Sequence, residues 1–170
     1  MPIKSHAIRA AVLTSLFALS AAASAQTLRV ANQGDALSLD PHSLNESLQL
    51  SVDSNAYEAL VGWNKKLEMV PMLATGWKQM SPTVWRFDLR KGVTFYDGTP
   101  FTADDVVFTM GRIAGEGSDM KSYSNDVKET RKIDSHTVEI ETKTPLPILP
   151  QILSQVLIMS KKWCEDNNAT

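Results

Sequence analysis

The chain has 170 residues, with 17 Lys and Arg against 19 Asp and Glu, and its formal net charge is -2. This mildly acidic balance argues against a nucleic-acid partner, which requires basic phosphate contacts, and against binding to an anionic membrane surface through a polybasic segment. Cys164 is the single cysteine, so an intramolecular disulfide is excluded.

The N-terminus has the pattern of a secretory signal peptide. A basic start that ends at Arg9 is followed by an uncharged, mostly apolar run over residues 10–23, and small residues occupy 23–25. The apolar run is shorter than the ~20 residues that cross a bilayer as a helix. We therefore predict a signal peptide over residues 1–25, cleaved before Gln26, and a periplasmic mature chain.

The first half of the mature chain alternates between strand, loop and helix patterns. Thr27–Ala31 is predicted as a strand and residues 32–47 as a polar loop. Leu48–Leu60 is predicted as a helix, whose apolar face comprises Leu48, Val52, Ala56, Ala59 and Leu60. For residues 61–77 we expect a short strand or turn and then an irregular segment broken by proline.

The second half contains clearer strand patterns. In the strand predicted from Thr83, residues Trp85, Phe87 and Leu89 share one face. Residues 127–133 and 136–142 are predicted to form an antiparallel hairpin, with Val138 and Ile140 buried. Residues 144–160 predict a short helix followed by a buried strand, and Ser160 is placed to cap another helix. These elements together predict an α+β fold.

Three aspartates in "FYDGTPFTADDVVFTM", residues 95–110, raise the question of a carboxylate site. Asp97-Gly98 is a turn signal, because Asp bonds its downstream backbone and Gly accepts a positive φ. Thr102 is predicted as a helix N-cap, with Asp104 and Asp105 in the first turn and Asp105 completing a capping box. A calcium loop would place oxygen ligands at alternate positions and end in Glu. We therefore interpret Asp97, Gly98, Thr102 and Asp105 as structural residues.

The sequence predicts no metal, no cofactor and no catalytic residues. His42 and His136 are far apart and lack the short ligand spacings of zinc sites. A hydrolase with paired carboxylates at Asp104 and Asp105 is the enzyme alternative, but adjacent helical residues point about 100° apart. Neither G-x-S-x-G nor H-E-x-x-H occurs in the sequence. We therefore expect a protein that is not an enzyme.

The segment Leu89–Met110 resembles the signature region of the cluster-C periplasmic solute-binding proteins, also called extracellular solute-binding protein family five. Four further segments resemble the family in the same order: Ser38–His42, Tyr57–Asn64, Val70–Lys78 and Lys132–Pro150. These proteins are the peptide and nickel receptors of ABC importers. The resemblance implies an α/β receptor of two lobes that closes over a small polar solute, such as a peptide, and presents it to a membrane permease.

Members of this family are considerably longer than the present chain. We therefore expect residues 26–170 to be an incomplete, monomeric N-terminal portion. It would comprise the first part of lobe I and most of the extra subdomain of the cluster, truncated before lobe II. Two other readings stay open, namely a remnant or interaction module that does not transport and a secreted hydrolase.

The resemblance also implies candidate ligand-binding residues. In the family, the loop after the first strand lines the cleft, and the stretch after the signature helix often supplies an aromatic side chain. These positions correspond to Asn45, Glu46 and Ser47, and to Tyr123. For the first three the alternative is an ordinary solvated loop, and for Tyr123 a core or surface tyrosine.

Overall fold

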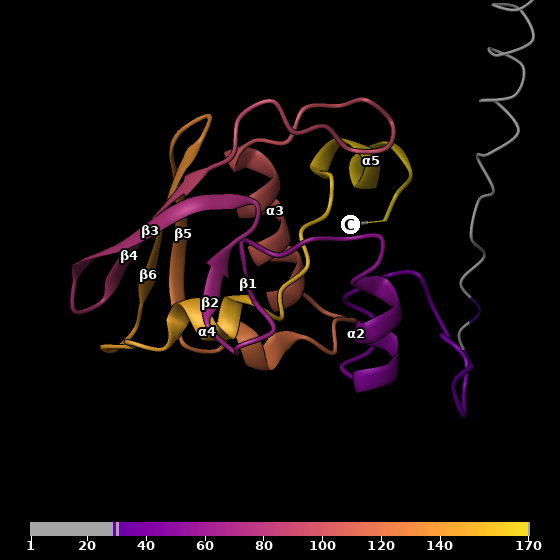
Figure 1. Cartoon of the computed structure of the whole chain (residues 1–170). Helices are drawn as coiled ribbons and strands as arrows, with labels where there is room; N and C mark the ends of the chain where they lie inside the picture. Colours follow the sequence, from indigo (N-terminus) through magenta and orange to yellow (C-terminus); the bar gives the residue numbers. More distant parts are fainter. Residues whose placement is uncertain (1–28, 30, 170) are drawn as a thin grey trace, which may run out of the picture. The chain divides into compact units, whose positions relative to one another are not determined.

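Four antiparallel strands form the main sheet, in the order β3-β4-β6-β5 (Figure 1). The strands are β3 (Ala74–Ser81), β4 (Val84–Leu89), β5 (Val127–Asp134) and β6 (Thr137–Thr142). The computed structural model describes Arg29 and residues 31–169, so the predicted signal peptide and most of the predicted strand Thr27–Ala31 lie outside the described residues. The expected α+β class with antiparallel strands is confirmed.

The two central strands have one apolar and one charged face, as the period of two predicts. Phe87 of β4 and Val138 and Ile140 of β6 are fully buried. The opposite face carries Arg86, which pairs with Glu139 across the strands at 2.7 Å. The predicted strand around Phe87 and the predicted hairpin of β5 and β6 are therefore confirmed.

Helix α3 (Ala103–Ala114) packs on the apolar face of this sheet and contacts β5 and β6. On its other side it contacts η1, a 3-10 turn at Lys121–Tyr123, and α5 (Lys161–Asp166) (Figure 1). Phe101 and Val106, at the spacing of a hydrophobic staple, are both buried in the core. The long helix thus connects the sheet to the side of the molecule where the candidate site lies.

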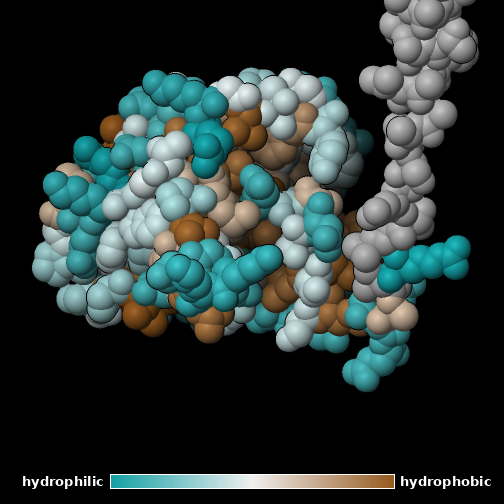
Figure 2. Space-filling view, viewed as in Figure 1, coloured by the Kyte–Doolittle hydropathy of each residue, from teal (hydrophilic) through white to brown (hydrophobic). Residues whose placement is uncertain are grey.

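The remaining elements are short. They are α2 (Ser47–Asp53), the antiparallel hairpin of β1 (Val61–Trp63) and β2 (Met69–Pro71), and α4 (Leu149–Leu153). None of the helices in the described part of the chain is long and apolar enough to span a membrane. In the view of Figure 2, hydrophilic side chains predominate over the four-stranded sheet, and apolar surface shows between the β1–β2 hairpin and α2.

The predicted helix Leu48–Leu60 is wrong beyond Asp53, although Ala59 and Leu60 of its predicted apolar face are buried. Within α2 the predicted face is wrong, because Leu48 and Val52 are only partly buried. The residues of α2 that are buried are Gln49 and Asp53. The Gln49 side chain accepts from the backbone N–H of Leu37 at 3.1 Å and donates to the Ser38 carbonyl. Gln49 and Asp53 therefore turn inward, where the Gln49 amide bonds to the backbone of the preceding loop and to the Asp53 carboxylate at 2.7 Å.

Two further expectations need correction. The short strand expected at the start of residues 61–77 is present as β1, but the segment after it is not irregular, because it includes β2 and the start of β3. The buried strand expected before Ser160 is instead a buried irregular segment, which forms a single bridge between Leu157 and Ala59. The bridge partner of Leu157 is Ala59, far back in the chain, so a local pattern does not reveal this second pairing.

Candidate functional site

Two segments that are distant in the sequence run side by side and form the candidate site. The first is the loop of residues 40–47, and the second is the connection of residues 115–123 after α3. The carbonyl of His42 accepts from the Asp119 N–H at 3.1 Å and from Ser118 Oγ at 3.4 Å. At the other end, the Tyr123 hydroxyl donates to Asn45 Oδ1 at 3.3 Å.

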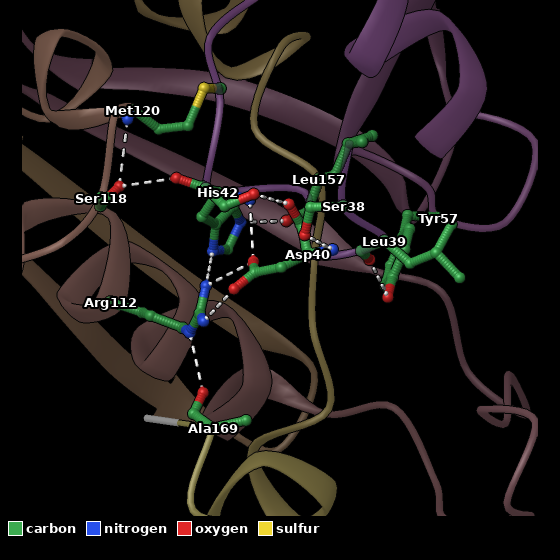
Figure 3. Close-up of polar contacts among 11 residues, drawn as sticks. Ser38, Leu39, Asp40, His42, Tyr57, Arg112, Ser118, Met120, Leu157 and Ala169 are labelled. Atoms are coloured by element: carbon green, nitrogen blue, oxygen red, sulfur yellow. Dashed lines mark hydrogen bonds and ion pairs between the residues drawn. The ribbon is translucent and has the colours of Figure 1, made fainter. Parts of the chain in front are cut away.

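The root of the loop is held by a polar cluster that we call the clamp: Asp40, His42 and Arg112 (Figure 3). His42 is fully buried, and the other two side chains are partly buried. Arg112 extends from the last turn of α3, and its guanidinium forms a two-pronged ion pair with Asp40, at 2.9 and 2.6 Å. Its Nε donates to the Ala169 carbonyl at 3.0 Å. Such forked pairs fix the orientation of both partners as well as their separation.

Both ring nitrogens of His42 are engaged. Nε2 lies 2.9 Å from the Leu157 carbonyl, which can only accept, so Nε2 carries the proton. Nδ1 therefore has a free lone pair and accepts from Arg112 Nη1 at 2.9 Å. The structure thus selects the neutral tautomer with its proton on Nε2, and neither nitrogen is free to act as a base.

The electrostatics of the clamp agree with this assignment. Burial lowers the pKa of His42, and the neighbouring Arg112 charge lowers it further, although the bond to Leu157 opposes the shift. Burial alone would raise the pKa of Asp40, but hydrogen bonds from Arg112 and the His42 backbone hold it below its usual value. The clamp is therefore built for a charged Asp40 and an uncharged His42.

A pocket of ≈ 590 Å³ opens beside the clamp, between the loop and the connection after α3. Asp40 and His42 line it from the loop, Phe108 and Arg112 from α3, and Ser118 from the connection. Asn45 and Tyr123 are not part of its lining. A larger pocket of ≈ 880 Å³ lies between α5 and residues 93–97, away from the predicted ligand-binding residues.

The predicted ligand-binding residues are only partly brought together. Asn45, Glu46 and Ser47 are exposed, and Glu46 and Ser47 form the entry into α2. Tyr123 is half-buried, with its ring against the core and its hydroxyl on Asn45. Asn45 and Tyr123 therefore meet, although each was predicted from a different part of the sequence.

The signature segment has the predicted turn and helix cap. Gly98 has a φ of 83°, and Asp97 Oδ1 accepts from the Thr99 N–H at 2.9 Å, which closes the turn. Thr102 caps α3 and shares a capping box with Asp105. Asp105 also accepts from the Lys161 N–H at 2.9 Å, so it holds the start of α5 as well.

Sequence reasoning missed the three clamp residues as a unit. The sequence indicated Ser38–His42 as a family-like segment and His42 as a histidine without zinc-ligand spacing, and it gave no indication of Arg112. The only local indication of the clamp was an aspartate and a histidine on either side of a proline in a polar loop. Their partner Arg112 lies in α3, 72 residues from Asp40.

The described residues offer little for metal or thiol chemistry. No three His, Cys, Asp or Glu side chains among them are arranged to hold a metal ion. The Cys164 thiol is fully buried, and burial raises its pKa. A thiol in this state is less nucleophilic, because the reactive form is the thiolate.

Residues 68–170, more than half of the chain, match the family model described as bacterial extracellular solute-binding proteins, family 5 Middle. The chain is 29% identical to the periplasmic oligopeptide-binding protein OppA of Salmonella typhimurium, over 88% of this chain and 33% of that protein. It is 33% identical to the periplasmic murein peptide-binding protein MppA of Escherichia coli, over 65% of this chain and 24% of that protein.

The fold is also similar to solved structures. The structure of the Escherichia coli murein tripeptide binding protein MppA aligns with a TM-score of 0.70 and 26% identity, over 77% of this chain and 30% of that one. The expected likeness to periplasmic binding proteins is thus confirmed. The chain spans about a third or less of the length of the curated relatives it matches.

Proposed function

Because the chain belongs to the bacterial extracellular solute-binding proteins of family 5, we propose that it serves as the solute-binding component of an ABC importer. In this proposal the protein is exported by the signal peptide of residues 1–25 and acts in the periplasm. It captures a peptide or a similar small polar solute between two lobes and delivers it to a membrane permease.

The observation that carries the assignment of the site is the hydrogen bond between Tyr123 and Asn45. It supports a ligand-facing edge at which an amide, a phenol and the nearby Glu46 carboxylate are accessible together. An amide offers both a donor and an acceptor to a peptide bond, and a carboxylate suits an ammonium group. The names of the similar proteins from Salmonella and Escherichia coli support a peptide-like solute.

A thermal-shift screen of the purified protein tests this proposal. A ligand at 100 times its Kd stabilises the folded state by about 2.7 kcal/mol, which is readily measured. We expect di-, tri- or oligopeptides to raise the melting temperature, while sugars serve as the negative set and nickel complexes as the competing class. If none of these solutes stabilises the protein and the peptides are cleaved instead, the transport proposal is wrong and the hydrolase alternative gains support.

A further inference from the structure

Arg112 is the residue through which α3 reaches the loop of residues 40–47. Only 14% of its side chain is exposed, and its donors are divided among Asp40, His42 and the Ala169 carbonyl. Two of these three acceptors belong to the loop, while the helix that carries Arg112 is packed on the sheet. Arg112 therefore ties the loop to a helix that packs on the four-stranded sheet.

Beyond the clamp the loop has few anchors. Asn45, Glu46 and Ser47 are exposed, and the Glu46 side chain forms no capping bond with α2. The Tyr123 bond to Asn45, at 3.3 Å, is long for an O–H···O bond. Because the tip is weakly held, its position depends on the buried root.

We infer that Arg112, acting through Asp40 and neutral His42, is a positioning residue that sets where Asn45 and its neighbours meet a ligand. This inference rests on the proposed function, because that function gives the loop its ligand-facing role.

The geometry also makes the clamp sensitive to pH. A second proton on His42 would occupy Nδ1 and face the Arg112 N–H, which now donates to that atom.

The charged groups around His42 come from three elements. Arg112 faces it from α3, Asp40 from its own loop and Asp53 from α2. Leu157 and Asp119 contact His42 through backbone groups, and Ser118 contributes an uncharged hydroxyl. Glu116, in the connection after α3, lines the same pocket as His42. The Asp40 and Asp53 carboxylates favour a protonated His42, but burial and Arg112 outweigh them and lower its pKa. Acidification below about 6.5, the ordinary histidine pKa, should therefore loosen the root of the loop.

Hydrogen exchange read by mass spectrometry tests the positioning role without any ligand. We expect Arg112→Lys, which keeps the charge but loses the fork, to speed exchange of the His42 and Ser43 amides roughly tenfold, because both amides donate to Asp40. Arg112→Met should give at least the same increase. Arg90→Met is the matched control, because Arg90 also donates to a backbone carbonyl, at Met72, but lies outside the clamp. Unchanged protection of β5 and β6 identifies folded variants.

The same exchange measurement at different pH values uses His42→Gln. Its side-chain amide can donate to Leu157 and accept from Arg112, and it does not titrate. Between pH 8 and pH 5, exchange of the amides at positions 42 and 43 in the natural protein should rise relative to His42→Gln, and His136→Gln should behave like the natural protein. Equal exchange in folded Arg112 variants, or identical pH profiles for the natural protein and His42→Gln, overturns the inference.

Titration with tri-alanine in the same samples separates this inference from the proposed function. If the affinity for tri-alanine falls in the Arg112 variants together with the protection of the loop amides, both the inference and the proposed function are supported. Failure of the natural protein to bind any peptide counts against the proposed function alone, because loop exchange still decides the role of Arg112.

Discussion

The carboxylate of Asp105 lies between the N-termini of two helices. One oxygen accepts from the Thr102 N–H at 2.8 Å, and the other accepts from the Lys161 N–H at 2.9 Å. Burial raises the pKa of this carboxyl, and these hydrogen bonds only partly offset the cost. Because the pKa of Asp105 is higher in the folded state than in the unfolded state, its protonation stabilises the fold. This stabilisation is fully present below the unfolded-state pKa and is lost as the pH rises through the folded-state pKa. At neutral pH the two N–H donors must therefore offset a buried charge.

Asp105→Ala should lower the free energy of unfolding by about 1–3 kcal/mol, because two helix N–H groups lose their acceptor. Asp104→Ala is the matched control. Its carboxylate pairs with Lys132 at the surface, at 2.6 Å, and exposed pairs of this kind contribute about 0–1 kcal/mol. Urea unfolding at pH 7 measures both variants. Equal losses would mean that Asp105 does not connect the two helices as described.

At the scale of elements, β4 shows how strongly the two faces of the sheet differ. Phe87 is fully buried, while its neighbour Arg86 points to the other face and pairs with Glu139. Phe87→Ala should cost about 3–5 kcal/mol through the lost burial and the cavity it leaves. Arg86→Ala should cost about 1 kcal/mol or less, because its side chain is 39% exposed. Thermal or urea unfolding distinguishes the two, and similar losses would show that the faces are assigned wrongly.

The sequence correctly predicted those elements whose local pattern of apolar, polar and capping residues agrees with their burial in the fold. The alternation around Phe87, the hairpin of β5 and β6, and the capping residues of α3 each act within a few positions, so all were recoverable. Helix α2 was predicted too long and with the wrong face, since Gln49 turns inward to serve the backbone of Leu37 and Ser38. No periodicity rule anticipates a polar side chain whose partner is a loop.

The candidate site was predicted less completely for a related reason. Asn45 and Tyr123 were named because the chain resembles a family, and their meeting across 78 positions emerges only in the folded chain. The clamp joins residues 70 and 72 positions apart, and its His42 also donates to the Leu157 carbonyl, 115 positions away. Contacts of this range depend on the whole topology and leave no local signal in a single sequence.

For the whole molecule, the fold and the family membership agree, and the proposed role depends on whether the Asn45–Tyr123 edge contacts a solute. Each side chain contributes a polar group that can be removed singly. Loss of one hydrogen bond to a ligand corresponds to about 0.5–1.5 kcal/mol, or roughly twofold to tenfold in affinity. Tyr96, which is 94% exposed and lies outside this edge, provides a matched control for the loss of a phenolic hydroxyl.

Calorimetric titration of the purified protein with the peptide that stabilises it most is the most direct test of solute binding at this edge. We predict saturable binding of one peptide per chain, weakened roughly twofold to tenfold by Tyr123→Phe and by Asn45→Ala, and unchanged by Tyr96→Phe. Absence of saturable binding by the natural protein, or equal affinity in all four proteins, would contradict the account.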